Sequence, residues 1–184
     1  MALGSTVYTF DIQLANMDRG VYETLGLRVA CHPSETKEHL LTRVLAYCLE
    51  FTEGIAFSAG VSDTTEPAIT VRDLTGAWKS WIEIGTPDAA RLHRASKAAP
   101  RVVVYTHKQP ATLLKALTGE RIHRAEALEL YAMDRALIAE LAGRLERRLT
   151  FELSITERHL YLGIGGDTLT GVVERFTIPG PDGR

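Results

Sequence analysis

The segment from Pro33 to His107 contains one helix, three short strands, a second helix and a strand, in that order. Pro33 and Glu35 are residue types favoured in a first helical turn, so a helix is expected from there through Phe51. The last strand, RVVVYTH, is almost wholly apolar, which is typical of a strand buried on both faces. The segments are HPSETKEHLLTRVLAYCLEF, IAFSAG, PAITVRDL, AWKSWIEIG, PDAARLHRASKAA and RVVVYTH. This order predicts an α/β (α+β) fold with a mixed sheet flanked by helices.

The flanking segments add hairpins and further helices to this core. Residues 5–31 alternate around an Asn-Met-Asp-Arg-Gly turn and predict a β-hairpin. Residues 148–164 predict a second hairpin, and these late segments are expected to add antiparallel strands to the mixed sheet. The remaining expected elements are helices at 110–117 and 134–146 and strands at 126–133 and 170–178. No repeat or linker interrupts the chain, so one domain is expected over residues 1–184.

Apolar runs and cysteines exclude several classes of protein. No apolar run approaches the roughly 18 residues of a membrane span, and the first residues have neither a basic start nor an apolar signal core. A cytoplasmic protein without membrane contact is therefore expected. Cys31 and Cys48 have no CxxC spacing and predict ordinary small buried residues, not a zinc site or a disulfide framework.

Charge is distributed unevenly along the chain. The net charge of −2 argues against a generic polyanion binder. Residues 33–88 nevertheless contain nine acids and four bases, whereas residues 89–119 contain six bases and no acid. Arg91, Arg94 and Lys97 recur at three-residue steps in this basic segment, which indicates a broad helix face for nucleic-acid phosphates. A merely solvated surface explains the same pattern equally well.

Glu83 is an ionisable residue on a strand otherwise made of Trp and Ile. Residues two apart share a strand face, so Glu83, Trp81 and Gly85 point one way and Ile82 and Ile84 the other. The carboxylate is either a paired structural group or a ligand.

Acidic residues elsewhere are candidates to meet Glu83. At about 100° per residue, Glu38 falls at the edge of the apolar stripe of the first helix and Glu35 nearer solvent. Glu66, with Asp63 nearby, precedes the strand that forms a hairpin with the Glu83 strand. Converging carboxylates repel one another unless a cation lies between them, and oxygen ligands favour Mg²⁺ or Mn²⁺. Capping or pairing at the helix start is the other interpretation of Glu38.

Five motifs together resemble the bacterial YaeQ family over nearly the whole chain. They are MALGSTVY, HPSETKEHLLTRVLAY, AFSAGVSDTTEP, WIEIGTPDAARLHRASKAA and VVVYTHK. The resemblance implies a PD-(D/E)XK, or restriction-endonuclease-like, core of helix, three strands, helix and strand. In that superfamily acids on the helix and on the second and third strands hold Mg²⁺. The matching positions are Glu38, with Glu35 as second choice; Glu66, with Asp63 nearby; and Glu83.

The chain departs from the superfamily pattern at one position. Gly85 stands where the resemblance implies a lysine two residues after Glu83. Lys108 is the candidate replacement, because its strand is expected to lie beside the Glu83 strand, with both carboxyl ends on the same side if the two strands are parallel. His107 is a weaker candidate. An ordinary exposed lysine is the other interpretation of Lys108.

Two functions follow as hypotheses. The first is a divalent-metal-dependent phosphodiesterase acting on nucleic acid through Glu38, Glu66, Glu83 and Lys108. The second is a non-catalytic module on the same scaffold that binds nucleic acid or a protein partner. The missing lysine favours the second, and the question of enzymatic activity stays open at this point.

Overall fold

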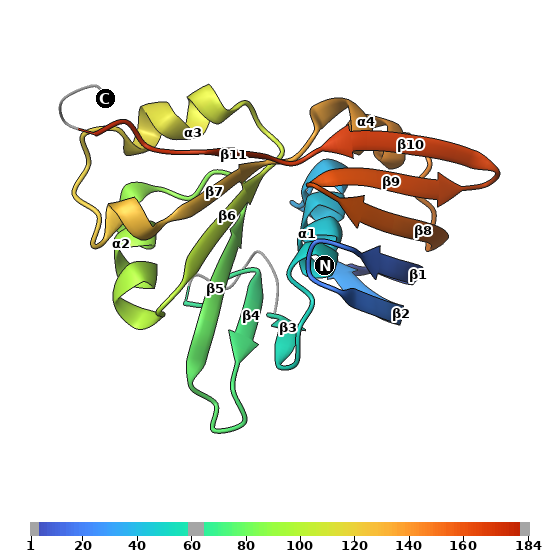
Figure 1. Ribbon diagram of the computed structural model, residues 1–184, viewed down its shortest axis with the longest axis horizontal. Coiled ribbons are helices and arrows are strands. Elements are labelled where there is room, and N and C mark those ends of the chain that lie inside the picture. Colours follow the sequence, from blue (N-terminus) through green and yellow to red (C-terminus); the bar gives the residue numbers. More distant parts are fainter. Residues whose placement is uncertain (1–3, 59–64, 181–184) are drawn as a thin grey trace.

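The computed structural model describes residues 4–58 and 65–180 as an α+β fold of two mixed sheets and four helices (Figure 1). The larger sheet has the strand order β11-β7-β6-β5-β4-β3, and the smaller sheet has the order β10-β9-β8-β1-β2. In the part of the chain that the structure describes, no helix is both long and apolar enough to span a membrane.

The larger sheet contains the order of elements expected from the sequence. β5, β6 and β7 are parallel to one another, and β3, β4 and β11 are antiparallel to their neighbours. The elements are α1 (Lys37–Leu49), β3 (Ile55–Phe57), β4 (Ile69–Arg72), β5 (Trp78–Ile84), α2 (Ala89–Ala98), β6 (Val102–Thr106), α3 (Pro110–Leu117), a 3₁₀ turn (Ala125–Ala127), β7 (Glu129–Ala132) and β11 (Glu174–Phe176). The helix, three strands, helix and strand predicted between Pro33 and His107 are thus confirmed.

The smaller sheet contains the hairpin of residues 148–164, which was expected to add antiparallel strands to the mixed sheet. β1 and β2 form the predicted hairpin, but β8 pairs with β1 in parallel and so builds a separate sheet. These strands bury every second residue, as in Phe10 and Ile12 of β1 and Phe151 and Leu153 of β8. A one-sided apolar pattern suits a second layer better than the interior of the first sheet. The elements are β1 (Thr6–Asn16), β2 (Val21–Cys31), α4 (Arg135–Gly143), β8 (Arg148–Thr156), β9 (His159–Ile164) and β10 (Asp167–Val172).

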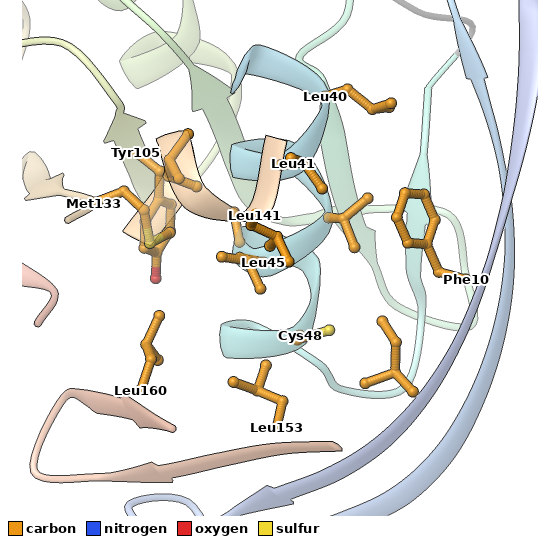
Figure 2. Packing of buried hydrophobic residues seen from close by; sticks show 14 of the residues in the cluster. Phe10, Leu40, Leu41, Leu45, Cys48, Tyr105, Met133, Leu141, Leu153 and Leu160 are labelled. Atoms are coloured by element: carbon orange, nitrogen blue, oxygen red, sulfur yellow. The ribbon is translucent and has the colours of Figure 1, made fainter. Parts of the chain in front are cut away.

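Helix α1 lies between the two sheets and joins their cores (Figures 1 and 2). Leu41 and Leu45 are fully buried, and the same cluster contains Phe10 from the smaller sheet and Ile82 from β5. Helices α2 and α3 cover the opposite face of the larger sheet, where Trp81 and Leu92 belong to a second cluster. The packing therefore fixes the N-terminal end of α1 relative to the ends of β5 and β6.

Strand β5 has the two faces that the alternation predicts. Ile82 and Ile84 pack in the cluster around α1, and Trp81 packs in the cluster around α2. Both cysteines are free and buried, as expected.

Candidate functional site

A cavity of about 430 Å³ opens where the carboxyl ends of β5 and β6 approach the start of α1. Ligand sites in open α/β sheets commonly lie at such strand ends. Its walls come from five segments: the turn before α1 and the first two turns of α1, the residues before β4, the end of β5 and the turn after it, the start of α2, and the two residues after β6. The lining side chains that bear on chemistry are Glu35, His39, Arg43, Glu66, Glu83, Arg91, His107 and Lys108.

Three of the four residues predicted for catalysis line this cavity: Glu66, Glu83 and Lys108. Glu66 precedes β4, which is antiparallel to β5, so it lies at the carboxyl end of β5 with Glu83. Strand β6 lies parallel beside β5, and Lys108 follows the end of β6. The topology thus brings these groups together, and their chemical roles stay predictions. Asp63 lies outside the described residues.

The expected orientations of Glu38 and Glu35 are reversed. Glu38 is exposed and does not line the cavity, whereas the Glu35 side chain is 1% exposed and does. Helix α1 begins at Lys37, with Thr36 as the N-cap that accepts a hydrogen bond from the His39 amide. Glu35 therefore precedes the helix, and a rotation counted along the helix does not apply to it.

Glu35 is held by two side chains from α1. Arg43 donates from Nη2 to Oε1 at 2.9 Å and from Nε to Oε2 at 3.2 Å, and His39 Nδ1 lies 2.5 Å from Oε2. Burial acts to raise the pKa of Glu35, but His39 and Arg43 outweigh it and hold that pKa below its ordinary value. Sequence reasoning missed His39 and Arg43. The four-residue spacing between His39 and Arg43 was the available signal, because it places both side chains on one face of α1.

Glu83 is paired with a cation from α2. Arg91 Nε and Trp81 Nε1 each donate to Glu83 Oε1 at 2.6 Å, and Arg91 Nη2 donates to the Glu66 carbonyl at 2.7 Å. The Glu83 and Arg91 side chains are 7% and 21% exposed. The structure thus agrees with the first of the two interpretations of Glu83, a paired structural carboxylate.

The basic side chains of α2 do not share one phosphate-facing surface. Arg91, which pairs with Glu83, and Arg94 line one groove beside Trp78, whereas Lys97 lies with His93 in another hollow. Each three-residue step turns the side chain by about 60° around the helix, so six residues spread the three cations over a wide arc. Arg91 and Arg94 thus share a groove from which Lys97 is separate, and the role of the three residues in nucleic-acid binding stays a prediction.

Two histidines meet at the cavity wall. The His39 and His107 rings contact edge to face, with centroids 5.9 Å apart. Burial, followed by the charges of His39 and Lys108, lowers the pKa of His107 to about 4, so this ring is neutral at pH 7. Its buried Nδ1 has no hydrogen-bond partner among the described residues.

Gly85 has a backbone conformation that explains why no lysine occupies its position. Its φ is +97°, a region that residues with a side chain rarely adopt. A Cβ at this position would lie 3.6 Å from Cδ2 of His39. The turn after β5 therefore brings the backbone against the His39 ring in place of a third-strand lysine.

The described carboxylates do not form the expected magnesium site. Within residues 4–58 and 65–180, no group of three or more His, Cys, Asp or Glu side chains is placed to hold a metal ion. Glu35 and Glu83 are paired with Arg43 and Arg91, and Glu66 contacts Arg72 at 3.3 Å. These donors would have to leave their arginines to bind a cation, so the set as it stands does not fit Mg²⁺.

The positive charge of Lys108 in the cavity is not balanced by any carboxylate that the structure describes. Lys108 is exposed and forms no ion pair with any residue that the structure describes. Each lining carboxylate has an arginine partner, and the partner of Glu66, Arg72, lies just outside the lining. Counted with these partners, the cavity has one positive charge in excess, that of Lys108. Such a cavity favours an anionic ligand over a metal cation.

A comparison with known protein families matches most of the chain, including every residue that lines the cavity. The model of the family described as YaeQ protein matches residues 1–172. The chain belongs to the YaeQ family. The YaeQ proteins of Escherichia coli (strain K12) and Salmonella typhi, both described as uncharacterized, are 27% and 28% identical over 163 and 167 residues. Each match covers 88% of this chain and 90% of the relative.

Crystal structures of YaeQ proteins have the same fold. The YaeQ protein from Pseudomonas syringae superposes with a TM-score of 0.85 at 28% identity, covering 94% of this chain and 96% of that one. The YaeQ protein from Xanthomonas axonopodis pv. citri gives a TM-score of 0.82 at 28% identity, covering 95% and 99%. The predicted YaeQ membership is therefore confirmed, and the α+β fold is shared with solved YaeQ structures.

Proposed function

We propose that the cavity binds a phosphodiester group of nucleic acid, on a PD-(D/E)XK-like scaffold that acts as a binding module. The observation that carries this proposal is Lys108, an exposed ammonium group without an ion-pair partner in the described ranges, in a cavity whose carboxylates are each paired with an arginine. A phosphate oxygen is the kind of acceptor that such an ammonium group binds.

The surrounding geometry supports the same ligand. The cavity volume of about 430 Å³ lies in the range of small-ligand sites. A cavity of this size accommodates one nucleotide phosphate with its sugar. Neutral His107 and the His39 ring supply further polar edges beside Lys108. The order from α1 to β6 agrees with the core that the superfamily resemblance implied, and cores of this kind are associated with phosphodiester substrates.

Replacing Lys108 with alanine is expected to weaken binding of a labelled eight-nucleotide thymidylate on the order of tenfold, because one charge-assisted contact is lost. The slope of log affinity against log salt should fall by about one. Fluorescence anisotropy at several salt concentrations measures both. Lys115→Ala is the matched control, since Lys115 is an exposed lysine of α3 that does not line the cavity. Equal effects of the two changes would contradict a specific contact at Lys108.

Metal-dependent hydrolysis of the phosphodiester is the second candidate function. The observation that favours it is that Glu66 and Glu83 line the same cavity as Lys108. Both carboxylates would have to leave their arginines to bind a cation, so any affinity for Mg²⁺ or Mn²⁺ is expected to be weak.

Thermal unfolding with millimolar Mg²⁺ or Mn²⁺ tests this candidate. If the cavity holds the ion, the metal raises Tm of the wild-type protein and not of Glu66→Ala, since a ligand that binds only the folded state stabilises it. Glu38→Ala is the control and should keep the full shift, because Glu38 is exposed outside the cavity. An unchanged Tm for the wild-type protein would remove the second candidate.

A further inference from the structure

A second groove, of about 710 Å³, adjoins the cavity and shares Glu66 and Arg91 with it. Its walls come from β4, β5 and α2 and include two tryptophans and three arginines. The charged and aromatic residues are Glu66, Arg72, Trp78, Trp81, Arg91 and Arg94. They are spread over almost thirty positions of the chain. No continuous aromatic and basic motif is therefore visible in the sequence.

Three planar groups stack along this groove. The Arg72 guanidinium lies 3.7 Å from the centroid of the Trp78 ring, and the Trp78 and Trp81 centroids are 5.0 Å apart at an angle of 37°. Trp81 is buried and its Nε1 donates to Glu83, which fixes the inner end of the stack. Trp78 is partly exposed, and the Arg72 side chain is 34% exposed. The outer end of the stack is thus an accessible planar surface.

The charge of the groove is positive. Two of its three arginines are paired, Arg72 with Glu66 and Arg91 with Glu83, and Arg94 is exposed with no ion pair to the residues described here. Guanidinium and tryptophan planes stack on nucleobases, and arginines bind the adjoining phosphates. The combination matches a nucleotide whose base is unpaired, because a base inside a duplex has both faces covered.

We infer that this groove binds single-stranded nucleic acid, with a base stacked on the outer end of the Arg72 and Trp78 stack and the next phosphodiester in the cavity beside Lys108. The inference rests on the proposed function, since the shared residues Glu66 and Arg91 place the two hollows side by side. It adds to the proposed function that the protein binds a single strand in preference to a duplex.

The chain has two tryptophans, and both line this groove, so intrinsic fluorescence reports on it directly. Titration of the full-length protein with unlabelled eight-nucleotide thymidylate is expected to quench the emission. A duplex of the same length should bind more weakly. An oligonucleotide of the same length with abasic sites should bind about 5- to 100-fold more weakly than thymidylate, because stacking is lost while the phosphates remain.

Variants separate stacking from simple charge. Trp78→Leu is expected to lower the affinity for thymidylate by a similar factor and to leave the affinity for the abasic strand unchanged. Trp78→Phe keeps an aromatic plane and should retain most of the affinity. Circular dichroism checks that each variant is folded.

The outcomes distinguish this inference from the proposed function. If the abasic strand binds as tightly as thymidylate while Lys108→Ala still weakens binding, the groove inference is overturned and the proposed function stands. Tighter binding of the duplex than of the single strand also overturns the inference. If no oligonucleotide binds, the proposed function fails, and the groove inference fails with it.

Discussion

Replacing Glu83 with glutamine is expected to lower the free energy of unfolding by about 3–5 kcal/mol. The change keeps the size of the side chain but removes the carboxylate charge that is paired with Arg91, which is 21% exposed and lies 2.6 Å from Glu83. Trp81 also loses a charged acceptor for its indole hydrogen bond. The Arg91 guanidinium would then lose the carboxylate of Glu83 in a site largely shielded from water.

Urea denaturation of the wild-type protein and Glu83→Gln, both in chelator, measures this loss. The double variant Glu83→Gln with Arg91→Met should recover part of it, since it removes both charges of the pair. A Glu83→Gln variant as stable as the wild-type protein, or more stable, would contradict the structural ion pair. That result would favour the other interpretation of Glu83, as a carboxylate that binds a metal ion.

Replacing Arg101 with methionine is expected to cost about 3 kcal/mol at pH 7. Arg101 lies 2.7 Å from Glu50 and 2.5 Å from Glu129, and Tyr105 and Tyr131 donate to the same two carboxylates. Burial acts to raise the pKa of Glu129, but Arg101 and Tyr131 outweigh it and keep that pKa below its ordinary value. Because the Arg101 side chain is 37% exposed, water screens part of the effect.

The pH dependence of this loss identifies its cause. A lowered folded-state pKa of Glu129 stabilises the wild-type protein above the unfolded pKa of Glu, about 4.3, and this contribution is lost as pH falls through the folded pKa. The difference between the wild-type protein and Arg101→Met should therefore be largest near pH 7 and shrink below about pH 4. Urea denaturation at a series of pH values measures it.

A triple variant provides the control for Arg101. Glu50→Gln and Glu129→Gln added to Arg101→Met remove the stranded charges and should restore part of the stability. A loss that does not change with pH and persists in the triple variant would show that packing of the arginine stem, and not charge, is responsible.

Much of the larger sheet was predictable because its signals are local. Apolar runs, turn residues and the two-residue alternation of β5 gave the order from α1 to β6 and the opposite faces of Trp81 and Ile82. Lys108 was expected at the same sheet end as Glu83 on the condition that β5 and β6 are parallel, and the structure has that parallel pairing.

The flanking hairpins show where local signals end. Their strands were recognisable, but the parallel pairing of β8 with β1 joins segments more than 130 residues apart. The alternation in each strand predicts that one of its faces is buried, but it does not predict which strand lies beside it. The second sheet therefore depends on α1 offering an apolar surface to both layers.

The sequence by itself determined the order of core elements, the YaeQ resemblance and the meeting of Glu66, Glu83 and Lys108 at one sheet end. The tertiary structure decided which charged side chains form ion pairs and which do not. Arg91 and Arg101 counted as part of a basic segment, yet both are neutralised by carboxylates on other elements. It also decided that Glu35 faces the cavity and Glu38 faces solvent. The physical reason is that ion pairing and side-chain direction depend on distances between elements, which neither periodicity nor a charge count along the chain contains.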